Sequence, residues 1–177
     1  MIDKDLLKFL YKLKNTNRYA TVPVVTYESV AEHSYYVTLF SMMLCDELDI
    51  YGDQRVKILQ MALIHDLPEA ILSDIPTTSK SIFKQFGMDV DSISGELMKS
   101  ILPPYTGEMI EFEEKETIEA LVVKLADIAQ CFQYCYHEES LGNTNMEEVI
   151  MLINEGYQTI KNKLRKKYKI EPKLFDE

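Results

Sequence analysis

The sequence has little of what builds tight turns and little positive charge. Glycine and proline occur six times each in 177 residues, which favours helices joined by a few loops. Lys and Arg number 19 against 29 Asp and Glu, for a formal net charge of −10. Non-specific binding to nucleic acid or to a membrane surface needs clustered Lys and Arg, so we expect neither partner. The one dense basic run, 161–169, is expected to be a solvated helix end favoured by the helix dipole.

Long apolar runs and paired cysteines are also lacking. No run approaches the ~18 apolar residues of a membrane span, and the first residues lack the parts of a signal peptide. The three cysteines do not make a disulfide framework. Cys131 and Cys135 share a helical face without the other ligands of a structural zinc site, so we expect both to be buried small apolar residues. The compartment indicated by these absences is the cytoplasm.

What the sequence does have is helical periodicity along nearly its whole length. The pattern predicts a loop over 15–28 and helices over 3–14, 30–48, 53–65, 69–72, 79–86, 89–101, 108–139 and 146–168. Ser29 and Glu32 fit a capping box at the start of one helix, and Asp53 fits the cap of the next. No period-2 alternation is long enough for a central strand. We therefore expect an all-α bundle of roughly six to eight helices in a single domain spanning 1–177.

Three polar sites interrupt this apolar pattern, and functional residues tend to lie where a sequence breaks its local rules. His65 and Asp66 directly follow an apolar helix, Asp127 lies within the apolar stretch LVVKLADIA, and His33 lies beside an apolar and aromatic helix face. A buried carboxylate is costly unless it is paired or bound to metal. Side chains from different helices of a bundle can converge on one ion, and imidazole with carboxylate suits Mn²⁺, Co²⁺, Fe²⁺, Ni²⁺ or Zn²⁺.

Each of these residues also has a simpler interpretation. A single histidine such as His33 is more often a core or capping residue than a ligand, and the His65-Asp66 dipeptide is common. Asp127 follows Lys124 by three residues and fits an internal ion pair equally well. The prediction of a metal site depends on the four residues as an ordered set.

The ordered pattern of His33, His65-Asp66 and Asp127 resembles the metal-binding motif of the HD superfamily of phosphohydrolases. Its surroundings, Arg18-Tyr19, Glu32-His33, His65 through Glu69, and Asp74, resemble bacterial 5′-deoxynucleotidases and small phage enzymes that hydrolyse deoxynucleoside triphosphates. The resemblance covers nearly the whole chain. It departs at Tyr19, where those deoxynucleotidases have Trp. Ala70 stands where hydrolases of guanosine pentaphosphate and tetraphosphate have an acidic residue, which argues against that branch.

The resemblance implies a role for each matching residue. The metal ligands would be His33, His65, Asp66 and Asp127, holding one divalent ion, with Mg²⁺ added to the ions above. Glu69 would transfer a proton or position the water, and Asp74 would contact the sugar or help to fix the nucleotide and water. Arg18 would hold a phosphate, and Tyr19 would stack on or wall off the sugar or base. Lys80 and Lys124 are further candidate phosphate contacts, because an acidic protein that binds an anion needs local positive charge.

The expected function is hydrolysis of phosphate from deoxynucleoside 5′-monophosphates. A deoxynucleoside triphosphate triphosphohydrolase is the alternative, since both would use the same motif residues. A non-catalytic nucleotide-binding HD module is disfavoured, because neither a ligand nor Glu69 is lost. The related enzymes are commonly homo-oligomers, so we expect a dimer or larger assembly. The 11 Tyr and 9 Met could face another subunit or fill the core.

Overall fold

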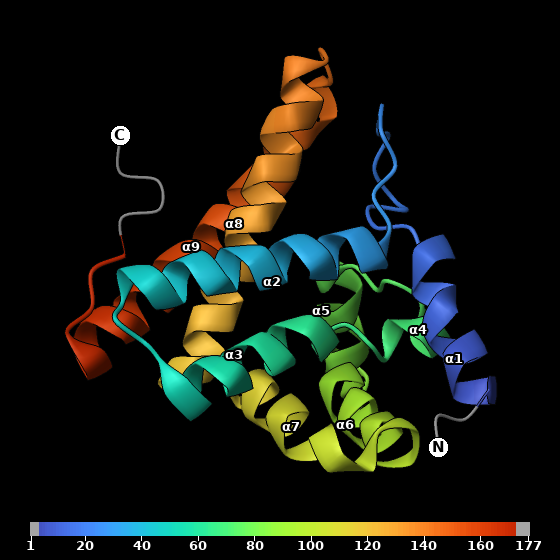
Figure 1. The fold of residues 1–177 in the computed structure, drawn as a ribbon. Helices are drawn as coiled ribbons and strands as arrows, with labels where there is room; N and C mark the ends of the chain where they lie inside the picture. The colour runs from blue at the N-terminus through green and yellow to red at the C-terminus, as the bar shows by residue number, and fades with distance from the viewer. Residues whose placement is uncertain (1–3, 173–177) are drawn as a thin grey trace.

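The computed structural model describes residues 4–172 as a bundle of helices (Figure 1). Within that range it has eight α-helices of seven residues or more, one single-turn helix and no strand. The predicted all-α fold is confirmed. The α-helices are α1 (Lys4–Leu10), α2 (Val30–Glu47), α3 (Gly52–Ile64), α4 (Glu69–Leu72), α5 (Thr77–Gln85), α6 (Val90–Ile101), α7 (Thr106–Glu114), α8 (Ile118–Ser140) and α9 (Glu147–Lys163). Three short 3-10 helices lie between them, η1 (Tyr11–Asn15), η2 (Pro103–Tyr105) and η3 (Thr144–Met146), and the π-helical η4 (Leu164–Tyr168) comes after α9.

The core is built around α8, which crosses α2 at a steep angle in Figure 1. Helices α2, α3, α7 and α9 all pack against it. From Ala120 to Ile128 nearly every side chain of α8 is buried, which is the pattern of a helix enclosed on all sides. A polar residue in this segment of α8 is therefore cut off from water.

The predicted capping box at Ser29 is present and starts α2. The Ser29 hydroxyl accepts from the backbone N–H of Glu32 at 3.2 Å, and the Glu32 carboxylate accepts from the backbone N–H of Ser29 at 2.8 Å. Both N–H groups would otherwise lack partners at the helix start. The box fixes where α2 begins, and so places His33 in its first turn.

Two predicted boundaries were wrong. The helix cap expected at Asp53 is Tyr51, and Asp53 lies in the first turn of α3, where the helix dipole favours a carboxylate. The stretch 108–139 is two helices, because Lys115 adopts a left-handed conformation at φ 54°. Thr117 then caps α8 by accepting from the N–H of Ala120. The apolar period continues across this break, so it was invisible in the pattern.

The basic run 161–169 is only partly a solvated helix end. Lys163 and Lys167 lie within 2.8 and 3.1 Å of the Glu116 carboxylate, and the Tyr168 hydroxyl donates to the Glu116 carbonyl at 2.9 Å. Exposed ion pairs of this kind contribute little singly, about 0–1 kcal/mol. Together they fasten η4 to the turn between α7 and α8.

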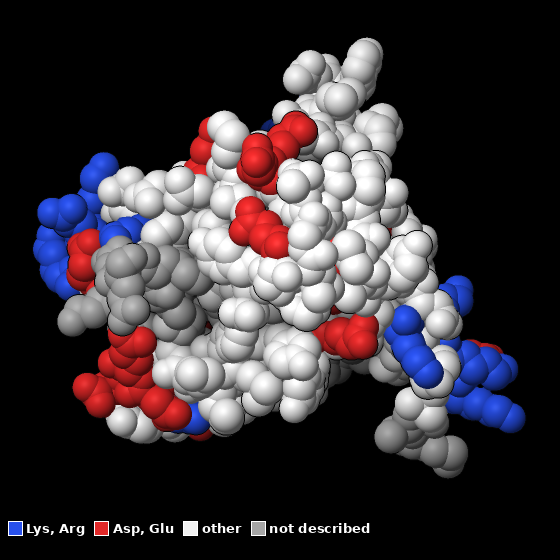
Figure 2. Space-filling model, turned by 90° about the horizontal axis from the view of Figure 1, so that it is seen from above, with Lys and Arg blue, Asp and Glu red and all other residues white. Residues whose placement is uncertain are grey.

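The outer surface carries its basic residues unevenly. On the face seen in Figure 2, Lys and Arg gather at opposite edges, while acidic and uncharged side chains occupy the middle. None of the helices between residues 4 and 172 is long and apolar enough to cross a membrane.

Replacing Ser29 with Ala should destabilise the protein by about 1 kcal/mol, because the first turn of α2 loses its capping acceptor. Urea unfolding followed by circular dichroism measures the change. Ser81→Ala, at an exposed position of α5, is the matched control and should change stability by less than ~0.5 kcal/mol. Equal stability of the two variants would contradict the role of the box.

Candidate metal centre

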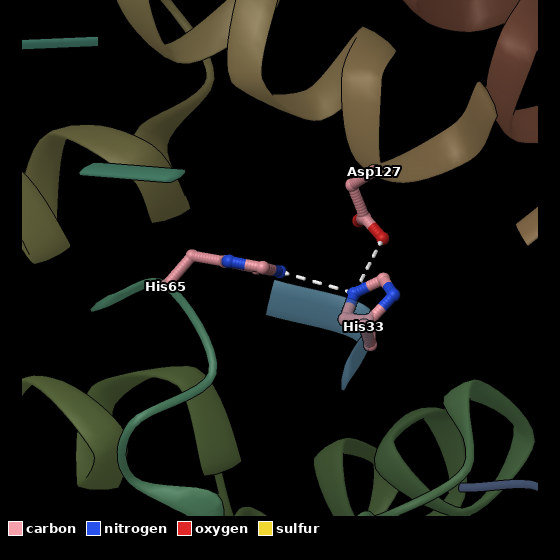
Figure 3. Close-up of side chains that lie close together, drawn as sticks. All are labelled: His33, His65 and Asp127. Atoms are coloured by element: carbon pink, nitrogen blue, oxygen red, sulfur yellow. Dashed lines mark hydrogen bonds and ion pairs between the residues drawn. The ribbon is translucent and has the colours of Figure 1, made fainter. Parts of the chain in front are cut away.

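Three side chains, His33, His65 and Asp127, meet at one point beside α8 (Figure 3), and Asp66 lies next to them. His33 comes from the first turn of α2, His65 from the residue that ends α3, Asp66 from the turn after it, and Asp127 from the middle of α8. His33 Nε2 lies 3.3 Å from His65 Nε2, 3.3 Å from Asp127 Oδ1 and 3.4 Å from Asp66 Oδ2. The His65 Nε2 atom lies 3.2 Å from Asp66 Oδ2. The structure thus brings the four predicted ligands together.

These separations fit a shared cation. Ligand atoms about 2.0–2.2 Å from one ion at ordinary coordination angles lie roughly 3.0–3.5 Å from each other. The ligating atoms of His33, His65 and Asp127 also lie within 4.8 Å of one another and are buried. Four protein ligands leave positions open on a five- or six-coordinate ion. The residues present can therefore hold a divalent metal and leave room for water and a substrate oxygen.

Both histidines have the outer support that metal ligands need. Because the Nδ1 atom of His65 lies 2.7 Å from the Ala62 carbonyl, it is set to donate there, and the Nε2 lone pair is free to face the ion. The Nδ1 atom of His33 lies 2.5 Å from the Gln130 side-chain oxygen and 2.5 Å from Arg18 Nη1, and these contacts hold the ring orientation. Each imidazole thus points Nε2 inward.

Electrostatics keep the carboxylates in their metal-binding form. Burial raises the pKa of Asp66, but the two histidines outweigh it and hold that pKa well below its usual range. Burial also raises the pKa of Asp127, but Lys124 and His33 outweigh burial and hold that pKa well below its usual range. Lys124 Nζ lies 2.5 Å from Asp127 Oδ2, so Lys124 balances this charge.

Gln130 and Glu28 were missed in the sequence. Gln130 contacts His33 as above and donates to the Glu28 carboxylate, while Arg18 Nη1 donates to Glu28 at 3.1 Å and to Gln130 at 3.1 Å. Both residues are buried. The signal for Gln130 was an amide three residues after Asp127 in the same apolar helix. Glu28 carried no signal beyond preceding the capping serine.

Arg18 and Tyr19 lie on the far side of His33 from the ligating atoms. Arg18 Nη1 is 2.5 Å from His33 Nδ1, and its Nη2 is 3.3 Å from Cys131 Sγ. The Tyr19 ring stacks on Tyr134 at 4.5 Å, with the Arg18 guanidinium 5.1 Å from the ring centre. Tyr19 is thus already packed within the protein. Cys131 is half-buried rather than a simple apolar residue, whereas Cys135 is buried as expected.

A pocket opens beside the four ligands and contains Glu69. It is lined in part by His65, Asp66, Glu69, Lys80 and Glu113. Burial and the neighbouring charges of Asp66 and Asp74 raise the pKa of Glu69 to about 10, and its Oε2 atom is buried without a partner among the described residues. Glu69 therefore carries a proton at neutral pH until a bound cation lowers its pKa. A buried carboxylic acid in a pocket is a candidate acid or base.

Asp74 and Lys80 both lie near Glu69. Asp74 Oδ2 accepts the Tyr19 backbone N–H at 3.2 Å, and burial raises its pKa although Arg18 opposes the shift. The residue before it, Ser73, has φ 63° and ψ 169°, a strained conformation of a kind that clusters at functional sites. Lys80 lines the pocket and lies 3.6 Å from Asp91. Asp74 thus forms a hydrogen bond to the 15–28 loop, and Lys80 places a positive charge on the pocket wall.

Comparison with known proteins agrees with this geometry. A family model described as HD domain matches residues 10–169. The 5′-deoxynucleotidase HDDC2 of Dictyostelium discoideum is 30% identical over 159 residues, covering 78% of this chain and 80% of the relative. The chain belongs to the HD domain family of phosphohydrolases.

Solved structures share the fold. A conserved hypothetical protein from Pyrococcus furiosus superposes with a TM-score of 0.74 at 30% identity, covering 92% of this chain and 99% of that one. The HD phosphohydrolase of cyanophage S-2L, solved bound to dA and one catalytic Zn²⁺ ion, has a TM-score of 0.66 at 19% identity, covering 94% and 86%. The second likeness supports the fold alone.

Replacing Gln130 with Leu should weaken metal binding by about 10- to 100-fold, because His33 loses the acceptor that orients its ring. Competition titration with a chromogenic chelator measures the dissociation constant. Gln133→Leu, at an exposed position of the same helix, should leave that constant unchanged. Affinity of the Gln130 variant within twofold of wild type would remove Gln130 from the metal site.

Proposed function

We propose that this protein hydrolyses the phosphate ester of deoxynucleoside 5′-monophosphates, using a water activated by one divalent ion. The observation that carries the proposal is the convergence of His33, His65, Asp66 and Asp127 next to a pocket that contains the buried Glu69 carboxyl. The Dictyostelium relative named a 5′-deoxynucleotidase supports the reaction. The cyanophage enzyme, which shares the fold, was solved bound to dA and one catalytic Zn²⁺ ion, and the proposed substrate and metal are of the same kinds. Any of Co²⁺, Mn²⁺, Fe²⁺, Ni²⁺, Zn²⁺ or Mg²⁺ is compatible with these ligands.

Different residues of the site would bind the ion, orient its ligands and transfer protons. A divalent ion, when bound, neutralises phosphoryl charge and lowers the pKa of a water. Asp66 and Asp127 are held ionised to bind it, and His33 and His65 are oriented by Gln130 and by the Ala62 carbonyl. Glu69, a buried carboxyl on the pocket wall, is suited to protonate the leaving 5′ oxygen and to accept a proton from water. Lys80 supplies positive charge on the pocket wall, while Lys124 balances Asp127 and Arg18 is bonded to Glu28 and Gln130 behind His33.

A triphosphate substrate remains the second candidate. The favouring observation is positive charge beside the pocket: Lys80 lines it, and burial together with the charges of Lys124 and Lys80 lowers the pKa of the nearby Lys115. These lysines could contact phosphates beyond the first. Lys115 was not identified in the sequence.

Turnover assays with dAMP, dTMP, dATP and dGTP, each with Co²⁺ or Mn²⁺, separate the two reactions. We expect nucleoside and inorganic phosphate from the monophosphates. Release of tripolyphosphate from dATP or dGTP, without turnover of dAMP or dTMP, would favour the triphosphohydrolase. No turnover of any nucleotide with any of the ions named above would contradict both and leave a binding module.

Glu69→Gln should lower kcat by at least ~10²-fold while metal content stays at the wild-type level, because only the proton-carrying group is removed. Asp127→Asn is the contrasting variant. It should lose metal and also destabilise the fold by about 3–5 kcal/mol, because Lys124 is left without its buried partner. Metal analysis, kinetics and urea unfolding measure these effects. Wild-type kcat in the Glu69 variant would exclude this residue from the mechanism.

Three expectations from the sequence stay predictions: a single domain over 1–177, a homo-oligomer, and a cytoplasmic location. Light scattering of the purified protein measures the second directly.

A further inference from the structure

The loop between η1 and α2 lies along the C-terminal half of α8, rising beside it in Figure 1. Its two ends pair with each other: Arg18 N–H donates to the Glu28 carbonyl at 2.9 Å, and Val30 N–H donates to the Thr16 carbonyl at 2.9 Å. We call the N-terminal part of the loop, which carries Arg18 and Tyr19, its first leg. The C-terminal part, which carries Glu28, is its second leg. Whatever fixes this loop also fixes these side chains.

Three residues of α8 hold the loop, and their spacing of four residues puts them on one helix face. Gln130 binds Glu28 and Arg18, as described above. Tyr134 donates its hydroxyl to the Thr26 carbonyl at 2.7 Å and stacks on Tyr19. Glu138 lies one turn further along α8 and binds the second leg at Val25 and Thr26.

Glu138 is the strongest of these attachments. Its Oε2 accepts the Val25 N–H at 2.7 Å, and its Oε1 accepts the Thr26 N–H at 2.7 Å and the Thr26 hydroxyl at 2.5 Å. Asn143 Nδ2 donates to Oε2 at 2.7 Å and to the Pro23 carbonyl at 2.9 Å. The carboxylate is fully buried. Burial raises its pKa, but these hydrogen bonds outweigh burial and lower the pKa to about 2, so the group is an anion at neutral pH.

Tyr19, Val22 and Val24 pack against Tyr134, Cys135 and Met146, whereas the stretch that Glu138 binds has little apolar burial. Val25 is 57% exposed and Tyr27 is 76% exposed. Bonds to an ionised acceptor are about twice as strong as neutral ones, so the three donors from Val25 and Thr26 make Glu138 a strong attachment for this leg. Asp74 receives the Tyr19 N–H and links the other leg to the pocket.

We propose that Glu138 is a positioning residue for nucleotide binding, which holds the 16–29 loop against α8 and so sets Arg18 and Tyr19 relative to the metal centre. The proposal rests on the proposed function for its kinetic consequence, but not for the holding of the loop. Glu138 touches no substrate, and its effect is transmitted through Thr26, the paired legs and Arg18.

The first test measures the loop itself, by amide hydrogen exchange in Glu138→Gln. The Gln side chain has one acceptor oxygen and turns an NH₂ group toward a loop N–H, so local opening becomes easier. We expect exchange at Val25 and Thr26 to quicken by roughly tenfold or more, with α3 unchanged. Glu139→Gln, exposed on the same turn, is the matched control and should change neither.

The second test is kinetic. Glu138→Gln should raise KM for dAMP roughly tenfold with normal metal content and a smaller change in kcat, and Glu138→Asp should restore part of the loss. Because the effect passes through Arg18, the double variant with Arg18→Ala should be no worse than Arg18→Ala alone.

The outcomes are distinct. Equal quickening of exchange in α3 and in the loop would show a general loss of stability, and it would overturn the proposal. So would unchanged loop exchange, or multiplicative effects of Glu138→Gln and Arg18→Ala on kcat/KM. If the wild-type protein neither binds nor hydrolyses any nucleotide, the proposed function fails, and loop exchange still decides whether Glu138 holds the loop.

Discussion

The negative charge of Asp127 is the constraint around which the molecule is organised. It lies in α8 directly after a run of fully buried apolar side chains, where an unpaired carboxylate would cost several kcal/mol. Lys124 on the same helix and His33 on α2 surround it. Meeting this requirement forces the start of α2 and the end of α3 to face the middle of α8. The packing of the core and the assembly of the metal centre are therefore one arrangement.

This constraint also explains what the sequence could predict. A charged or imidazole side chain inside an apolar period is visible as a local exception, which is why His33, His65, Asp66 and Asp127 could be named together. The capping box at Ser29 was visible because two residues at fixed spacing satisfy two backbone groups. Helical periodicity without strand alternation was enough for the all-α fold.

The remaining residues could not be predicted because their partners lie far away in the chain. Glu138 looks like an ordinary acidic residue near a helix end, and three of its four donors come from the folded 16–29 loop. Glu28 acquires its role from Gln130, about a hundred residues later. Tyr19 was expected beside a substrate, and its ring is instead stacked on Tyr134. The break at Lys115 escaped notice because the apolar period runs through it.

The attachment of one loop along one helix restricts how this protein can change during evolution. Asp127 and Glu138 are eleven residues apart on α8, close to three full turns. Insertion or deletion of one residue between them would rotate one site by about 100° relative to the other, separating the metal ligand from the loop anchor. The exposed residues in that interval, Gln133, Tyr136 and His137, carry no such restriction. Natural variants should therefore differ freely in the identity of these residues, while the number of residues in the interval stays constant.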